Sequence, residues 1–97
     1  MSFERAELIE NEKELNKLIN KIFNKQQEVI IVDIEYNTSR NVSFTVSTDR
    51  YTIIPEGLLI VDGKTMAVYV LQDNLSTVFL MYLRKYLNKN REKLVFI

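Results

Sequence analysis

The sequence contains no cysteine and no histidine, and these two absences restrict its chemistry more than any motif does. Without cysteine there can be no disulfide, thiolate nucleophile, iron–sulfur cluster or thiolate-bound zinc. Without histidine there is no imidazole acid–base catalyst, no Ser-His-Asp triad and no histidine-ligated metal. Any metal would be a hard cation held by carboxylates. We expect no metal, no cofactor and no enzymatic activity.

Glycine is nearly as scarce, because Gly57 and Gly63 are the only two in the chain. Neither opens a predicted helix, so no Gly-rich phosphate-binding loop is expected. No apolar run approaches the roughly 18 residues of a membrane span. The first residues lack the basic and apolar regions of a signal peptide. These features predict a cytoplasmic protein that does not enter a membrane.

The residues that are present have the balance of an ordinary globular protein. The chain has 97 residues, of which 46% are hydrophobic and 27% are charged. This length predicts a single domain over residues 1–97. Thirteen acidic and thirteen basic residues cancel, so the chain as a whole is not a general binder of polyanions or polycations.

Residues 3–25 are predicted to form an amphipathic helix. Ser2 is the expected N-cap, and Glu4 and Glu7 lie where the positive end of the helix dipole favours acidic side chains. Apolar residues recur at spacings of three, four and seven, at Leu8, Ile9, Leu15, Leu18, Ile19, Ile22 and Phe23. This pattern indicates a helix lying across a sheet.

From Glu28 onward apolar and polar residues alternate, which is typical of half-buried strands. Asp62-Gly63 between two apolar runs predicts a hairpin. Asp73 or Asn74 is the expected N-cap of a second helix ending near Asn88. The predicted strands cover residues 28–36, 42–48, 51–54, 58–61, 65–71 and 94–97. The expected order is α-β-β-β-β-β-α-β, an α+β fold with a five- to six-stranded, mainly antiparallel meander sheet and two helices packed on it.

The second helix carries more apolar surface than one face can hold. Residues 78–83 are apolar without a break, whereas a surface helix needs only an apolar stripe. The surplus is either buried between the sheet and the first helix, or it contacts a second copy or another protein. We predict a protein-interaction surface, most simply in a homodimer, formed by Leu80, Met81, Tyr82, Leu83 and Tyr86.

The end of the chain is basic. Residues 74–97 carry a net charge of +4, whereas residues 1–35 carry a net charge of −3. With Tyr82 and Tyr86 nearby, this segment could bind phosphates and stack on bases. It could equally be a solvated helix end that complements the helix dipole. The candidate nucleic-acid-binding residues are Arg84, Lys85, Lys89, Arg91 and Lys93.

A third hypothesis concerns Asp62 and Lys64. Asp62-x-Lys64 at the end of an apolar strand resembles the motif of restriction-endonuclease-like nucleases, in which carboxylates hold a metal and a lysine assists the attacking water. Asp49 is a candidate second carboxylate, and Glu10 or Glu14 a third. The hairpin turn, however, explains Asp62-Gly63 by itself.

We therefore expect a non-enzymatic interaction protein, a small inhibitor or adaptor that acts by protein–protein binding. Nucleic-acid binding is the alternative, and a metal-dependent nuclease ranks third. Small α+β domains rich in Ile, Lys and Asn are common in phages and other mobile elements of low-GC hosts. This association by composition suggests a viral or mobile-element protein that acts in the host cytoplasm.

Overall fold

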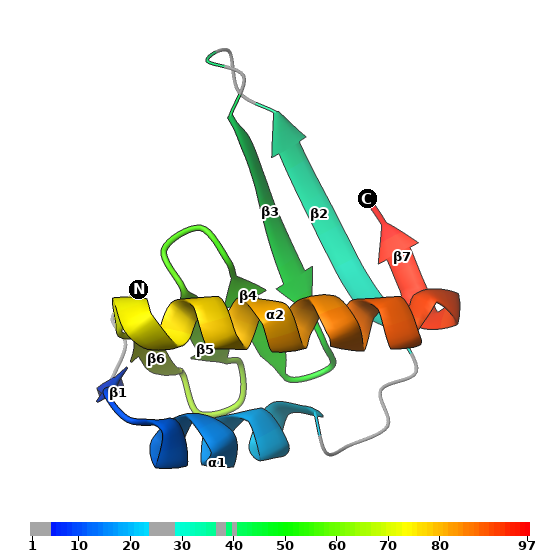
Figure 1. Ribbon diagram of the computed structural model, residues 1–97. Helices are drawn as coiled ribbons and strands as arrows, with labels where there is room; N and C mark the ends of the chain where they lie inside the picture. Colours follow the sequence, from blue (N-terminus) through cyan, green and yellow to red (C-terminus); the bar gives the residue numbers. More distant parts are fainter. Residues whose placement is uncertain (1–4, 24–28, 37–38, 40) are drawn as a thin grey trace.

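The computed structural model describes residues 5–23, 29–36, 39 and 41–97 (Figure 1). It confirms an α+β fold with a mostly antiparallel sheet and two helices. The elements in chain order are β1 (Arg5–Ile9), α1 (Glu12–Phe23), β2 (Ile30–Tyr36), β3 (Val42–Ser47), β4 (Tyr51–Ile54), β5 (Leu59–Asp62), β6 (Ala67–Leu71), α2 (Asp73–Lys89), a 3₁₀ turn η1 (Arg91–Lys93) and β7 (Leu94–Phe96).

The seven strands form one sheet in the order β1-β6-β5-β4-β3-β2-β7. Strands β2 to β6 are the antiparallel meander that the sequence predicts. At the two edges, β1 pairs in parallel with β6 and β7 pairs in parallel with β2. Parallel strands cannot be joined by a tight turn and need a crossover connection. Helix α1 lies in the connection from β1 to β2, and α2 lies in the connection from β6 to β7. Both helices therefore cross the meander.

The prediction of a helix over residues 3–25 is wrong at its N-terminal end, because residues 5–9 form β1. Helix α1 begins at Glu12, after Asn11, whose side-chain Oδ1 accepts the Glu14 backbone N–H at 2.9 Å. The Glu14 carboxylate in turn accepts the Glu10 backbone N–H at 3.5 Å. This arrangement resembles a capping box and explains why the helix starts here. Glu7 lies exposed in β1, and Ser2 and Glu4 fall outside the described residues.

The hydrophobic core lies between the helices and one face of the sheet. On the sheet side, one row of buried residues crosses five neighbouring strands in direct register, namely Val32, Val46, Ile53, Ile60 and Tyr69. On the helix side, the buried residues are Leu15, Leu18, Ile19 and Ile22 of α1 and Leu75, Phe79 and Leu83 of α2. All belong to one cluster, so the structure has one continuous core.

An aromatic cluster joins the two helices. The Phe23 ring at the end of α1 lies 6.2 Å from Phe79, 5.3 Å from Tyr82 and 4.4 Å from Tyr86, measured between ring centroids. These separations are typical of favourable tilted aromatic pairs. Part of the apolar surplus of α2 is therefore covered by α1 within the same chain.

The N-cap of α2 differs from the prediction. Gln72, not Asp73 or Asn74, is the N-cap of α2, and its side chain makes no capping hydrogen bond.

None of the helices in the described ranges is long and apolar enough to cross a membrane.

Candidate interaction surface

Strands β2 and β3 extend beyond their neighbours. Strand β7 pairs with β2 only over Ile30–Val32, and β4 pairs with β3 only at Val46 and Ser47. Residues 33–36 and 42–45 therefore form a two-stranded ribbon with no described strand on either side, which we call the arm. Figure 1 shows this arm running past α2, on the side away from α1. Strand β4 cannot support it, because it ends at Ile54 before Pro55.

The arm has one apolar face and one polar face. Register pairs Ile34 with Phe44 and Tyr36 with Val42, so these four residues share the face on which the helices lie. Tyr36 is 79% exposed, Val42 is 55% exposed and Phe44 is 37% exposed. The opposite face carries Asp33, Glu35, Ser43 and Thr45. Ile34, at the base of the arm, is half-buried against the core, whereas the outer part of the apolar face, at Tyr36 and Val42, is left uncovered.

A groove of about 280 Å³ lies where the arm meets α2. It is lined by Phe44 of β3 and by Leu80, Leu83, Arg84 and Leu87 of α2. Four of these five residues are apolar, and Arg84 supplies the charge. We call this cavity the arm groove. The four α2 residues follow helical spacings of three and four, so the groove runs along the helix axis.

The five α2 residues predicted to form an interaction surface point in different directions. Leu83 is 2% exposed and belongs to the core, and it also lines the arm groove. Leu80 is half-buried and lines the arm groove. Met81 is 58% exposed. Tyr82 and Tyr86 contact Phe23 of α1. The structure therefore does not bring these five residues together on one surface.

Sequence reasoning missed Phe44 and Leu87, which line the same groove as Leu80. The available signal was the length of the second and third strands. Strand β2 has seven residues and β3 has six, whereas β4 has four. Strands longer than their neighbours must project beyond the sheet, and the alternation in residues 42–47 continues into the projecting part.

The basic residues at the end of α2 lie at the surface. Arg84, Lys85, Lys89 and Arg91 are exposed and Lys93 is half-buried. Within the described part of the chain, none of the five forms an ion pair with a carboxylate. Their charge is therefore available to an outside partner. We call these five residues the basic cluster.

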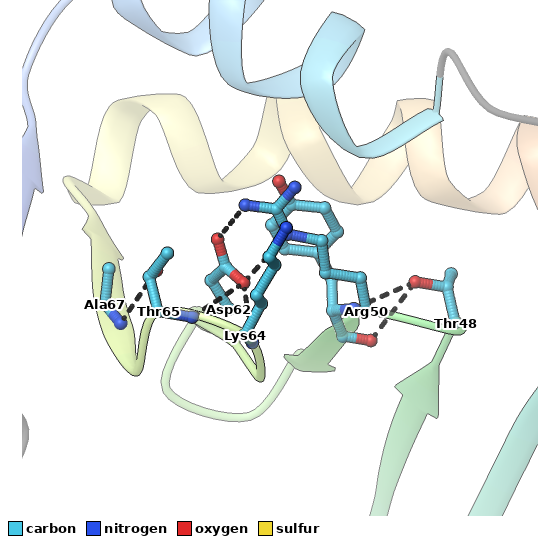
Figure 2. Close-up of polar contacts among 7 residues, drawn as sticks. Thr48, Arg50, Asp62, Lys64, Thr65 and Ala67 are labelled. Atoms are coloured by element: carbon cyan, nitrogen blue, oxygen red, sulfur yellow. Dashed lines mark hydrogen bonds and ion pairs between the residues drawn. The ribbon is translucent and has the colours of Figure 1, made fainter.

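The candidate nuclease residues form a structural contact instead (Figure 2). Asp62 is 1% exposed and accepts two hydrogen bonds from the Arg50 guanidinium, Nε to Oδ1 at 2.9 Å and Nη2 to Oδ2 at 2.7 Å. Its Oδ1 also accepts the backbone N–H groups of Lys64 at 2.9 Å and Thr65 at 3.4 Å. The Arg50 hydrogen bonds, followed by the Lys64 amide, hold the pKa of the Asp62 carboxyl far below its usual range.

These bonds tie the β5–β6 connection to the β3–β4 turn. The Gly63 backbone N–H donates to the Arg50 carbonyl at 2.8 Å, and a Cβ at Gly63 would lie 3.0 Å from that oxygen. The connection spans residues 63–66, with the Met66 N–H donating to the Asp62 carbonyl at 2.8 Å. The hairpin prediction is confirmed, but the loop is longer than the two-residue turn that Asp-Gly suggests.

Of the other candidate carboxylates, Asp49 lines a surface pocket with Arg50, Gly63 and Lys64, and Glu10 is exposed just before α1. In the part of the chain that the structure describes, no group of three or more acidic residues is placed to hold a metal ion. Glu14 caps α1, where its carboxylate accepts the Glu10 amide. Asp62 is already saturated by Arg50 and two backbone amides, so the residues do not fit the nuclease arrangement.

Comparisons of the chain with known protein families, with curated proteins and with solved structures found no match to any of them.

Proposed function

We propose that this protein is a non-enzymatic interaction protein that binds another protein through the arm and the arm groove. The observation that supports this proposal is the uncovered apolar face of the arm beside an apolar groove. A two-stranded ribbon is only marginally stable in water without further packing. Apolar surface of this kind typically marks a site of protein contact. The composition, rich in Ile, Lys and Asn, supports the further proposal that the protein is an inhibitor or adaptor encoded by a phage or another mobile element.

The proposal is tested with a photo-crosslinking amino acid placed on the arm. Tyr36 is the position to use, because it is 79% exposed and its replacement leaves the core intact. Lys64, exposed on the β5–β6 turn, is the matched control position. In lysate of the source organism, we expect a discrete crosslinked protein from position 36 and none from position 64. Equal labelling from both positions, or no product from position 36, would contradict the proposal.

Self-association is a separate prediction that concerns the outer side of α2. Met81 is 58% exposed, so it can contact a second copy without any rearrangement of the core. We expect a dimer in sedimentation at micromolar concentration. Met81→Glu should dissociate it while leaving the helical circular dichroism unchanged. A monomer at all concentrations would show that this exposed methionine has no part in self-association.

Nucleic-acid binding is the alternative function, and the exposure of the basic cluster favours it. Four of its five side chains are exposed without a carboxylate partner in the described ranges. Binding through phosphates would weaken steeply with salt, by about one power of the salt concentration for each phosphate contacted. The test is a salt titration of binding to single-stranded and duplex DNA and RNA, with the double variant Lys89→Glu/Arg91→Glu. If the protein does not bind any of these nucleic acids at low salt, nucleic-acid binding is excluded.

A further inference from the structure

We propose that the partner segment in the arm groove is an acidic amphipathic helix of another protein, an inference that rests on the proposed function above. Helices α1 and α2 cover one face of the sheet, and that cover ends partway along the arm. Ile34 and Phe44 lie on this face at the base of the arm, with Tyr36 and Val42 further out. A third helix laid on these residues would continue the existing helix layer.

The wall of the groove fits a helix better than an extended strand. Leu80, Arg84 and Leu87 follow one stripe of α2 over seven residues, which corresponds to about 10 Å of helix axis. A second helix packed along this stripe would place apolar side chains at i, i+3 or i+4, and i+7 against it. The floor provided by Phe44 supplies contact from the sheet, as in ordinary helix-on-sheet packing.

The charge within the groove selects an acidic occupant. Arg84 lines the groove itself and is exposed, whereas Lys85 and Lys89 lie on the other side of α2, because helical spacing turns them away from the leucine stripe. Glu92 is the sole acidic residue among residues 74–97. The acidic residues of the arm do not compensate, because Asp33 and Glu35 lie on its opposite face. An occupant with a carboxylate beside its apolar stripe would complement Arg84, and the net positive charge of residues 74–97 would favour its approach.

The same charges argue against a second copy in this groove. In a two-fold dimer, the same surface patch is contributed by both chains. The arm face and the groove offer four apolar arm residues, three leucines of α2 and one arginine, and no carboxylate that would meet Arg84 of the other chain. The concave apolar lining also distinguishes the groove from a flat surface for a bilayer and from an aromatic platform for bases.

The probe is a pair of fluorescent 18-residue peptides with the same leucine stripe and helix-favouring Ala and Gln. One peptide carries Glu beside the stripe and the other carries Lys at the same positions. Binding to the full chain is measured by fluorescence anisotropy at low and at physiological salt. We expect the Glu peptide to bind at least tenfold more tightly than the Lys peptide at low salt, with the difference shrinking as salt rises.

Three variants locate the binding site. Leu80→Ser should weaken the Glu peptide about tenfold, and Arg84→Glu should abolish the preference for Glu over Lys. Val78→Ser is the matched control, because Val78 is 44% exposed on the same helix but does not line the groove. It should leave the affinity unchanged. Circular dichroism on each variant verifies that the fold is retained.

Several results would overturn the inference. The first is equal affinity for the two peptides, and the second is no binding of the Glu peptide. The third is binding of the Glu peptide that Leu80→Ser leaves unchanged. The fourth is loss of Glu-peptide binding when the protein self-associates, which would place a second copy in the groove. Leu80-dependent binding to phosphatidylserine vesicles without peptide binding would instead assign the surface to a membrane. If the crosslink at position 36 appears but the Glu peptide does not bind, only the identity of the occupant is refuted. If neither appears, the proposed function is refuted as well.

Discussion

The replacement Asp62→Asn separates a structural from a catalytic role for this carboxylate. The amide has almost the same shape but no charge, and it has a single acceptor oxygen. Asp62 accepts two hydrogen bonds from Arg50 and two from backbone amides, and its side chain is 1% exposed. The variant therefore leaves at least one donor of the Arg50 fork without its acceptor and removes the charge from the others.

The expected cost follows from the number of bonds weakened. Hydrogen bonds to charged groups contribute about 1.5–3 kcal/mol each. Arg50 remains 27% exposed, so water screens the pair and can solvate the freed donor. We therefore expect Asp62→Asn to lower the free energy of unfolding by about 2 kcal/mol at pH 7, measured by urea denaturation.

The pH dependence provides an independent check. Because the folded-state pKa of Asp62 is depressed, its stabilisation is present above the unfolded-state pKa, near 3.9, and is lost as pH falls below it. Each pH unit below that value removes about 1.4 kcal/mol until the folded-state pKa is reached. The difference between wild type and variant should thus shrink by about 1 kcal/mol between pH 7 and pH 3.

Equal stability of the two proteins, or parallel pH profiles, would refute a structural role for the Asp62 carboxylate. A plasmid-nicking assay with Mg²⁺ or Mn²⁺ tests the catalytic role of Asp62 on the same two proteins. We expect no metal-dependent cleavage from wild type, because Arg50 and two amides already occupy the carboxylate. Nicking by wild type that Asp62→Asn abolishes would make the site catalytic.

Two further predictions concern stability. Gly63→Ala should destabilise the domain by about 1–3 kcal/mol, because its Cβ would lie 3.0 Å from the rigid Arg50 carbonyl oxygen, and an unchanged urea midpoint would contradict this. Removing residues 94–97 should lower the melting temperature by roughly 5–10 °C without abolishing the fold, because Leu94 alone packs against the core while Phe96 and Ile97 are 64% and 77% exposed. Loss of all cooperative unfolding in this truncation would show that β7 contributes more than its partial burial indicates.

The meander and the last strand were predictable because their signals are local. Alternation of apolar and polar residues and turn chemistry near Asp62 are read within a few residues. Strand β1 was not predictable in this way, because its partner is remote and Arg5 pairs with Ala67. Leu8 and Ile9 fit a helical stripe as well as a strand. The Asn11–Glu14 cap was the local signal that the helix begins later.

The arm shows why a binding surface is harder to predict than a fold. Val42 and Val46 lie on the same strand and the same face, within one unbroken alternating pattern. Val46 is fully buried at 0% exposure, whereas Val42 is 55% exposed. The difference depends on how far the helix layer reaches, which is a property of the assembled fold. A single alternating pattern cannot show where that cover ends.

The energetics of the arm indicate what kind of complex it can form. Covering Tyr36, Val42 and Phe44 completely would gain about 3–5 kcal/mol, taking about 1.5–3 kcal/mol per fully buried side chain scaled by what is now exposed. Association costs at least about 4 kcal/mol in lost translational and rotational freedom. Burial on the arm therefore only offsets that cost, and a micromolar complex requires about 8 kcal/mol net. The remainder must come from contacts with Leu80 and Leu87 and from a carboxylate opposite Arg84. A complex stabilised in this way is reversible and weakens with salt, as expected for a regulatory contact rather than a permanent subunit interface.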